Sequence, residues 1–297
     1  MNIAILVTCH NRCDTTLAFL RSLVTAIQEY KNSTVQRRPS AISLRSIATS
    51  NLQPIFHLFL VDDGSTDGTS EAVQEWYNST LFHSSLFTLH LIHANGSLYW
   101  ARGMSLAWRT ALEYETHRRS TSNLQPQPLF SHFLWLNDDA MLRPDAFIKI
   151  FDTAKSHPEL TVVNGSMVNK AGKVTYGLGI AIGLAGNCVL VPRDVYEKVG
   201  MICDKYSHAW ADRDYGMHVE KAGCKMVSCG IVGETEWHPH RPSLAGLSLR
   251  ERIAMLSNPK GWNLHDLWLF RIRNWNIFCA IFSCLHMTLR VLIGDRK

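Results

Sequence analysis

Two adjacent carboxylates, Asp138 and Asp139, directly follow an apolar run near the middle of the chain. The run Phe133–Leu136 predicts a buried strand. Because burying ionised carboxylates is costly, the two acids must lie where that strand emerges, at its carboxyl end. In a tight turn there, both can meet one hard cation or a ribose hydroxyl. Asn-Asp-Asp is also ordinary turn chemistry, so this stretch alone favours neither a ligand site nor a plain turn.

Other acids also stand beside predicted elements. Asp62 and Asp63 end an earlier apolar run and lead into a turn that contains two glycines. Asp212 and Asp214 stand beside the start of a helix, where acids can simply favour its positive end. Acids and imidazoles gather again in the short loop 234–240, although a histidine pair is more often exposed to solvent than bound to metal.

The elements that must position these acids alternate between strand and helix. Strands are predicted over 1–7, 55–61, 87–93, 133–136, 160–164 and 187–192. Helices are predicted over 15–30, 72–77, about 103–117, 144–155 and 193–199, with another following 212. The alternation predicts an α/β fold with a doubly wound, mostly parallel sheet flanked by helices. Such sheets bind ligands at the carboxyl ends of their strands.

Two segments interrupt this alternation. Residues 31–54, rich in Ser, Thr, Arg, Gln and Pro, are predicted to form an insertion loop. Gly177–Gly183 resembles a dinucleotide fingerprint, but its spacing is G-x-G-x-x-x-G and it comes late in the chain. A backbone that bends closely under a ligand is the preferred explanation of these glycines.

Composition and charge set further bounds. The 297 residues are 46% hydrophobic and 19% charged, which is ordinary for a globular protein. The eight cysteines form no C-x-x-C pair, so we expect reduced thiols in a cytoplasmic protein. Residues 1–240 carry 21 Lys and Arg against 22 Asp and Glu, whereas 241–297 carry 9 against 3. The whole positive excess therefore lies in the tail.

The ordered set of acidic motifs resembles the family 2 glycosyltransferases of the GT-A fold, similar to bacterial surface-polysaccharide glycosyltransferases. The set is Val61–Asp67, then Asn137-Asp138-Asp139, then Ala211–Asp214; the opening Thr8–Arg12 and the segment Asn95–Arg102 look like the same family. The resemblance spans roughly residues 1–240. It implies a GT-A catalytic domain with a nucleotide-sugar half over about 1–140 and an acceptor half over about 141–240, followed by a basic, aromatic helical tail over 241–297.

The resemblance also implies roles for single residues. Asp139 is expected to bind Mn²⁺ or Mg²⁺, together with His238 or His240, and Asp212 is expected to be the catalytic base, with Asp214 as its alternative and Trp210 as a further site residue. The residues expected to bind the donor nucleotide are Thr8, Asn11, Arg12, Asp62, Asp63, Arg102 and Asp138. Asn137 departs from a strict D-x-D motif and leaves the metal fewer anionic ligands.

The chemistry implied is inverting transfer of a sugar from a nucleotide-sugar donor to a hydroxyl of a glycan or lipid-linked acceptor. A divalent cation neutralises the departing diphosphate, and a carboxylate takes the acceptor proton. A sugar-nucleotide-forming nucleotidyltransferase is one alternative, but it would need a glycine-rich loop after the first strand, and Thr8–Arg12 has no glycine. A non-catalytic carbohydrate-binding relative is the other. No P-loop and no G-x-S-x-G elbow occurs in the sequence.

The tail has two interpretations. The run 275–293 is nearly long enough to span a bilayer, but Asn276, Ser283, His286 and Arg290 interrupt it. Its basic and aromatic composition suits peripheral contact with an anionic membrane, at the inner face if the protein is cytoplasmic, and its helical spacing argues against nucleic acid. The alternative is a last amphipathic helix packed on the catalytic domain.

Overall fold

The computed structural model describes residues 1–36, 54–121, 128–179, 183–235 and 243–294. In the first half the elements are β1 (Asn2–Cys9), α1 (Cys13–Gln36), β2 (Ile55–Asp62), α2 (Thr69–Asn78), α3 (Leu81–Leu86), β3 (Phe87–His93), α4 (Tyr99–Thr121), β4 (His132–Leu136), β5 (Met141–Leu142) and α5 (Ala146–Ser156). The second half adds β6 (Thr161–Val168), β7 (Val174–Tyr176), β8 (Cys188–Pro192), α6 (Arg193–Val199), α7 (Ala211–Lys221), β9 (Lys225–Glu234), α8 (Leu249–Ala254), α9 (Leu264–Asn274) and α10 (Ile277–Ile293).

One sheet forms the centre of the described chain, with strand order β3-β2-β1-β4-β8-β6-β9-β5 and β7 paired to β6. β3, β2, β1 and β4 are parallel neighbours, whereas β8 runs antiparallel to both β4 and β6. The predicted α/β class with a mostly parallel sheet is confirmed. The carboxyl ends of β1, β2 and β4 lie next to one another because these strands are adjacent and parallel.

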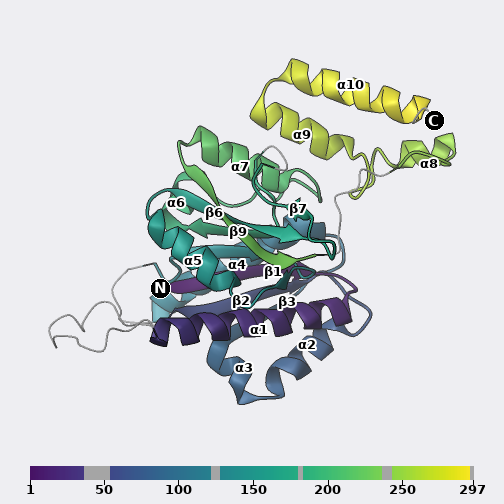
Figure 1. Cartoon of the computed structure of the whole chain (residues 1–297). Helices are drawn as coiled ribbons and strands as arrows, with labels where there is room; N and C mark the ends of the chain where they lie inside the picture. Colours follow the sequence, from purple (N-terminus) through teal and green to yellow (C-terminus); the bar gives the residue numbers. More distant parts are fainter. Residues whose placement is uncertain (37–53, 122–127, 180–182, 236–242, 295–297) are drawn as a thin grey trace.

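Helices cover both faces of this sheet, which explains why its central strands are continuously apolar (Figure 1). On one face, Ile5 of β1 packs in a core with Phe19 of α1 and Phe147 of α5. On the other face, Leu6 belongs to a core with Trp108 of α4, and α6 and α7 contribute to the same core. The two layers fix the starts of α1, α4 and α7 relative to the strand ends.

Helix α1 is longer than its sequence pattern predicts. It continues from the predicted end at Tyr30 to Gln36, into the segment predicted as an insertion loop. The hydroxyls of Ser33 and Thr34 donate to carbonyls three residues back, so these polar residues remain compatible with helix. Residues 37–53 of the predicted loop lie outside the described part of the chain.

The C-terminal helices are connected to the sheet domain by packing contacts. α9 packs against α7, and α10 packs against α9 (Figure 1). Phe270 of α9 is 2% exposed and its ring stacks on that of Trp210 with centroids 4.6 Å apart. α9 is therefore packed on the domain, whereas the last helix, α10, packs against α9. None of the described helices is long and apolar enough to cross a membrane.

Candidate active site

The loops after β1 and β2 form one hydrogen-bonded surface at the carboxyl edge. The register pairs Cys9 of β1 with Asp62 of β2, so the two loops start side by side. The backbone N–H of Asn11 donates to Ser65 Oγ at 2.8 Å, and Asn11 Oδ1 accepts from the N–H of Thr66 at 2.7 Å. The predicted donor-binding residues of both loops thus occupy one edge of the sheet.

The loop after β4 brings Asp138 and Asp139 to the same edge, where they share the guanidinium of Arg12. Arg12 Nη1 donates to Asp138 Oδ1 at 3.1 Å and to Asp139 Oδ2 at 3.0 Å. The Arg12 side chain is 38% exposed, against 7% for Asp138 and 18% for Asp139. Burial raises the pKa of Asp138 to about 6, although the charge of Arg12 opposes the shift. The guanidinium of Arg12 therefore stabilises both neighbouring carboxylates.

Asp63 positions the segment that begins α4. Its Oδ1 accepts from the N–H of Gly96 at 2.9 Å, and its Oδ2 accepts from the N–H groups of Leu98 and Tyr99, each at 2.9 Å. Both oxygens are therefore engaged with backbone. Asp62 accepts hydrogen bonds from the N–H of Ser65, in the loop after β2, and from the hydroxyl of Ser70, in α2. The pair predicted to hold the nucleotide orders the loops around it.

Three site loops contain a residue in the left-handed region of φ. Asn11 has φ 49°, Tyr99 has φ 56° and Trp210 has φ 75°; among the described non-glycine residues only Leu160 joins them, at φ 45°. Bulky aromatic side chains rarely adopt this conformation, and such strain persists where surrounding contacts impose it, often at functional sites. Here the contacts are the Asp63 carboxylate beneath Tyr99 and the Phe270 ring against Trp210.

Asp212 lies in the first turn of α7. Its Oδ1 accepts from the N–H of Arg213 at 2.8 Å, and its Oδ2 accepts from the N–H of Gly186 at 3.0 Å. Burial raises the pKa of Asp212, while the charge of Arg213 and the two N–H groups oppose the rise. A partly buried carboxylate with a raised pKa, held by two backbone donors, is suited to accept a proton.

Trp100 connects the strand-end acids to Asp212. Its Nε1 donates to Asn137 Oδ1 at 2.8 Å, and its ring lies so close to Gly186 that a Cβ there would stand 2.6 Å from a ring carbon. The same hypothetical Cβ would lie 3.3 Å from Asp212 Cβ. Asn137, the departure from D-x-D, therefore receives the indole of Trp100 through its side-chain oxygen.

Tyr176, at the end of β7, is influenced by the charges of both groups of acids. Burial raises the pKa of Tyr176, and the negative charges of Asp139 and Asp212 raise it further. The Tyr176 phenol is thus close enough to both carboxylates for their charges to raise its pKa. Asp139 and Asp212, which are 73 positions apart in the sequence, thus both influence the pKa of this phenol.

Asp214 has a different environment from Asp212, although only two residues separate them. Its carboxylate is buried and accepts from Arg273 Nε at 3.1 Å, and from Asn274 Nδ2 at 2.7 Å. Both donors belong to the last turn of α9. Asp214 therefore fastens α9 to α7, and these contacts favour Asp212 over Asp214 as the proton acceptor.

A second carboxylate fastens α9 to the loop that precedes α7. Asp266 of α9 is fully buried and accepts from the N–H and hydroxyl of Ser207 at 3.1 and 2.7 Å, and from the N–H of His208 at 3.2 Å. Burial lowers the pKa of His208 to about 4; Lys260 lowers it further, while Asp266 opposes the shift. His208 Nδ1 is buried without a hydrogen-bond partner in the described structure, and its ring lies edge-on to Tyr99.

The strand-end acids fit a divalent cation. Asp139 Oδ1 is buried and has no hydrogen-bond partner, while Arg12 occupies the Oδ2 side. No cluster of three or more His, Cys, Asp or Glu occurs among the described residues. Mg²⁺ and Mn²⁺ sites in phosphate-transferring enzymes are commonly completed by substrate oxygens and water around one or two carboxylates. One free carboxylate oxygen beside a second acid matches that pattern.

The remaining predicted residues are placed as follows. Thr8 lies at the end of β1 against Gly103, whose lack of a Cβ lets α4 approach it. Arg102, in the first turn of α4, has no hydrogen-bond or ion-pair partner among the described residues. His238 and His240, the expected metal ligands, lie outside the described part of the chain.

Gly183, the last glycine of 177–183, allows this segment to approach α7 closely. Gly183, at φ 78°, lies against the backbone of Arg213, and a Cβ there would stand 2.6 Å from the Arg213 carbonyl oxygen. Gly216 of α7 makes the reciprocal approach, since a Cβ added to it would stand 2.5 Å from the N atom of Leu184. Gly183 and Gly216 therefore let this segment and α7 pack closely.

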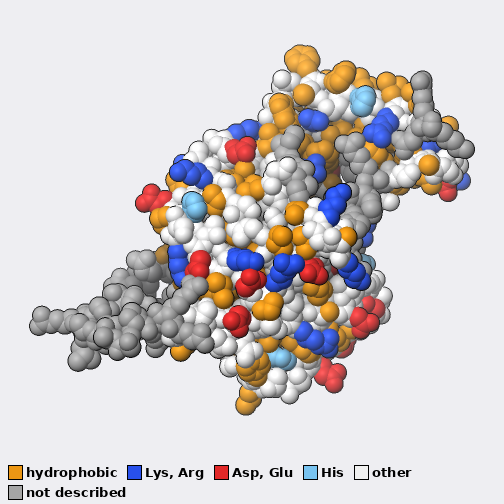
Figure 2. All heavy atoms as spheres, viewed as in Figure 1, with side chains coloured by type: hydrophobic (Ala, Val, Ile, Leu, Met, Phe, Trp, Pro, Cys, Tyr) orange, Lys and Arg blue, Asp and Glu red, His pale blue; other side chains and the backbone are white. Residues whose placement is uncertain are grey.

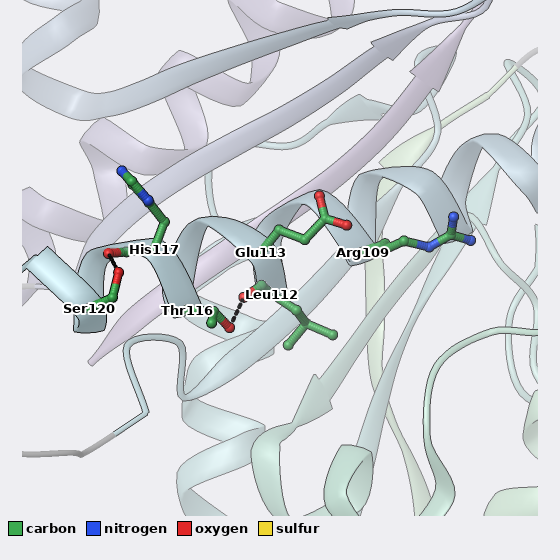
Figure 3. Close-up of a pocket in the computed structure, with 6 residues that line it drawn as sticks. All are labelled: Arg109, Leu112, Glu113, Thr116, His117 and Ser120. Carbon is green, nitrogen blue, oxygen red and sulfur yellow. Dashed lines mark hydrogen bonds between the residues drawn. The ribbon is translucent and has the colours of Figure 1, made fainter.

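A shallow depression on α4 lies away from these acids. It measures about 460 Å³, and Figure 3 shows the six side chains that line it: Arg109, Leu112, Glu113, Thr116, His117 and Ser120. Because α4 begins at the carboxyl edge and runs back along the sheet, these later turns point toward the opposite edge. None of the predicted site residues lines the depression.

Solved structures share this architecture. The mannosyltransferase PcManGT from Pyrobaculum calidifontis, in complex with GDP-Man and Mn²⁺, is 13% identical with a TM-score of 0.53, over 97% of this chain and 69% of that one. The chain has the GT-A fold. S. aureus TarS 1–349 in complex with UDP is 11% identical with a TM-score of 0.52, over 100% of this chain and 73% of that one. In a further TarS structure the match covers 86% of this chain and 40% of TarS, with a TM-score of 0.51 and 12% identity.

No protein-family model and no curated protein matches the sequence. At these low identities the likeness establishes the fold, and the predicted resemblance is confirmed at that level.

Sequence reasoning missed four residues of this site: Trp100, Tyr176, His208 and Asp266. Trp100 stands within a segment that resembles the family, but nothing in that segment singles it out. Tyr176 and His208 have no neighbouring acid or metal-ligand spacing to mark them. Asp266 stands in the tail, outside the acidic motifs of residues 1–240.

Proposed function

We propose that the protein is a glycosyltransferase that moves a sugar from a nucleotide-sugar donor to a hydroxyl of a glycan or lipid-linked acceptor. The observation that carries the proposal is that Trp100 links the two groups of acids: its Nε1 donates to Asn137, beside Asp138, and its ring lies against Gly186, whose N–H donates to Asp212. The PcManGT structure contains GDP-Man and Mn²⁺, and the TarS 1–349 structure contains UDP, which supports a nucleotide-sugar donor.

The donor half of the site would be built by the loops after β1, β2 and β4. Asp139, with Asp138 beside it, would hold Mn²⁺ or Mg²⁺ through the buried oxygen that has no other partner. Such a cation supplies neutralisation of the charge that develops on the departing diphosphate. Arg12 and Arg102, at the same edge, offer positive charge to the phosphates, and the loops ordered by Asp63 border the nucleotide.

The acceptor half would be built around Asp212. Its carboxylate would accept the proton of the acceptor hydroxyl, because burial raises its pKa while two backbone N–H groups keep it in place. With this carboxylate assigned to the acceptor and none to the anomeric carbon, the hydroxyl displaces the diphosphate directly. The anomeric configuration is then inverted.

The alternative functions lack a comparable observation. A nucleotidyltransferase would cradle a triphosphate in a glycine-rich loop after β1, but this loop is His10-Asn11-Arg12, with Asn11 bonded to Ser65 and Thr66. A non-catalytic sugar-binding protein would have no need for an acid with a raised pKa at the start of α7. Cleavage of a donor by the purified protein separates a catalyst from a binder.

The test uses a panel of GDP- and UDP-sugars with manganese, and measures donor binding and slow release of the nucleoside diphosphate. We expect at least one donor to be bound and hydrolysed, and Asp212→Asn to lose at least about a hundredfold in rate while still binding it. Glu113→Gln, an exposed acid of the α4 depression, is the matched control and should keep the rate. Binding without hydrolysis would favour the non-catalytic alternative, and full activity in Asp212→Asn would remove the assigned base.

A further inference from the structure

Helix α10 presents an apolar face that no described part of the chain covers. Its exposed members follow helical spacing: Phe278, Phe282, Leu285, Leu289 and Ile293, with 78, 73, 60, 57 and 65% of their surface accessible. Taking about 150–250 Å² for a large apolar side chain, this face exposes on the order of 600 Å², as much as the largest apolar patches of ordinary monomers. Figure 2 shows hydrophobic side chains gathered over this end of the molecule.

The opposite face of α10 is packed, so the exposed face is not a consequence of a helix standing alone. Ala280 and Val291 are fully buried, and Val291 belongs to a small core with Leu244 and Trp262. Arg252 Nη1 donates to the carbonyl oxygen of Leu292 at 3.0 Å and so caps the end of α10. The helix is held in place with its apolar side outward.

The charges around this face are almost all positive. Residues 243–294 contain two acids, of which Asp266 is fully buried and Glu251 is exposed. The basic residues of the same segment are Arg250, Arg252, Lys260, Arg271, Arg273 and Arg290. Trp275, 43% exposed, lies beside the apolar face with the Arg271 guanidinium 4.9 Å from its ring. Apolar, aromatic and basic groups at one surface complement an anionic lipid headgroup layer.

We propose that α10, with the basic residues around it, docks on a membrane surface that contains anionic lipid, lying in the plane of the interface. A second copy of the chain fits the face less well. A stable interface buries about 800 Å² on each partner, and a symmetric pairing of this face would bring the arginines of both copies together. The docking proposal is independent of the reaction that the site catalyses, so its test does not depend on glycosyl transfer.

Docking at α10 would also place the candidate active site at the surface. α9 packs against α10 and holds the start of α7 through Asp266 and Asp214. Docking would therefore tether the start of α7 to the membrane through α9.

The experiment is sedimentation of the full chain with vesicles of phosphatidylcholine, with and without phosphatidylglycerol. We expect binding to the anionic vesicles that weakens with salt, each basic residue near the surface contributing roughly fivefold. Replacing Phe278, Phe282 and Leu289 together with Gln should weaken binding at least about tenfold, because their apolar area no longer leaves water. The matched control is Leu81→Gln with Phe82→Gln on α3, which removes two other exposed apolar side chains, 88 and 42% accessible.

Circular dichroism and an unchanged urea midpoint establish that the triple variant is folded. Failure of the unmodified chain to bind either vesicle overturns the proposal, and so does undiminished binding by the folded triple variant. A concentration-dependent dimer that the triple substitution abolishes, without vesicle binding, would assign the face to a second copy and overturn the proposal as well.

Discussion

Replacing Arg12 with Met should strengthen the binding of Mn²⁺ to the protein in the absence of nucleotide. Arg12 Nη1 now donates to both strand-end acids, at 3.1 Å to Asp138 and 3.0 Å to Asp139. A divalent cation at the same carboxylates must displace this guanidinium or tolerate its repulsion. Methionine keeps the apolar stem of the side chain and removes the charge.

The size of the effect follows from the two hydrogen bonds that the cation has to disturb. A hydrogen bond to a charged group contributes about 1.5–3 kcal/mol when buried. Arg12 is 38% exposed, so screening by solvent reduces the sum of its two bonds to about 2 kcal/mol. At about 1.4 kcal/mol for each factor of ten, Mn²⁺ should bind Arg12→Met roughly thirtyfold more tightly.

The assay is titration calorimetry with manganese, supported by electron paramagnetic resonance of free Mn²⁺. Arg12→Lys retains a charge at this position and should stay close to the unmodified affinity, while Asp139→Ala should lose binding in either background. If Arg12→Met bound Mn²⁺ equally or more weakly, Arg12 would be a support of the metal site and not its competitor, and the reasoning would be wrong.

Two further predictions concern the stability of the folded chain. Asp266→Asn should lower the free energy of unfolding by about 2–3 kcal/mol and slow turnover, because one of the oxygens that accept from Ser207 and His208 becomes an N–H donor. Urea unfolding and rate measurements check these two effects. A free energy of unfolding equal to that of Glu113→Gln would contradict the prediction. Burial lowers the pKa values of His57, His132 and His208 to about 4 each, below the unfolded value of 6.5, so the unfolded chain binds more protons and stability should fall as the pH drops from 6.5 toward 4. Each histidine can contribute up to about 2–3 kcal/mol, and Asp138, whose pKa burial raises to about 6, opposes part of the loss; a urea midpoint that stays constant across this range would refute the assignment.

Local patterns in the sequence determined the central sheet and the position of its acids. The apolar run ending at Leu136 could only be a buried strand, and the charges of Asp138 and Asp139 could only lie beyond its end. The parallel arrangement followed from strand and helix alternation for the same reason, since each segment must bury one face or both. The apolar spacing of 275–293 likewise predicted a helix.

Only the tertiary structure distinguishes the environments of neighbouring acids. Asp212 and Asp214 are equivalent in sequence, but Asp214 is occupied by Arg273 and Asn274, about 60 positions later, whereas Asp212 accepts from the N–H groups of Arg213 and Gly186. Periodicity reports burial within one element, whereas these partners come from elements that meet only after packing. The same holds for the tail: its composition suited a membrane throughout, yet Phe270 is buried on α7 while Phe278, eight residues later, is exposed, because only the packing of α9 fixes which face remains outside.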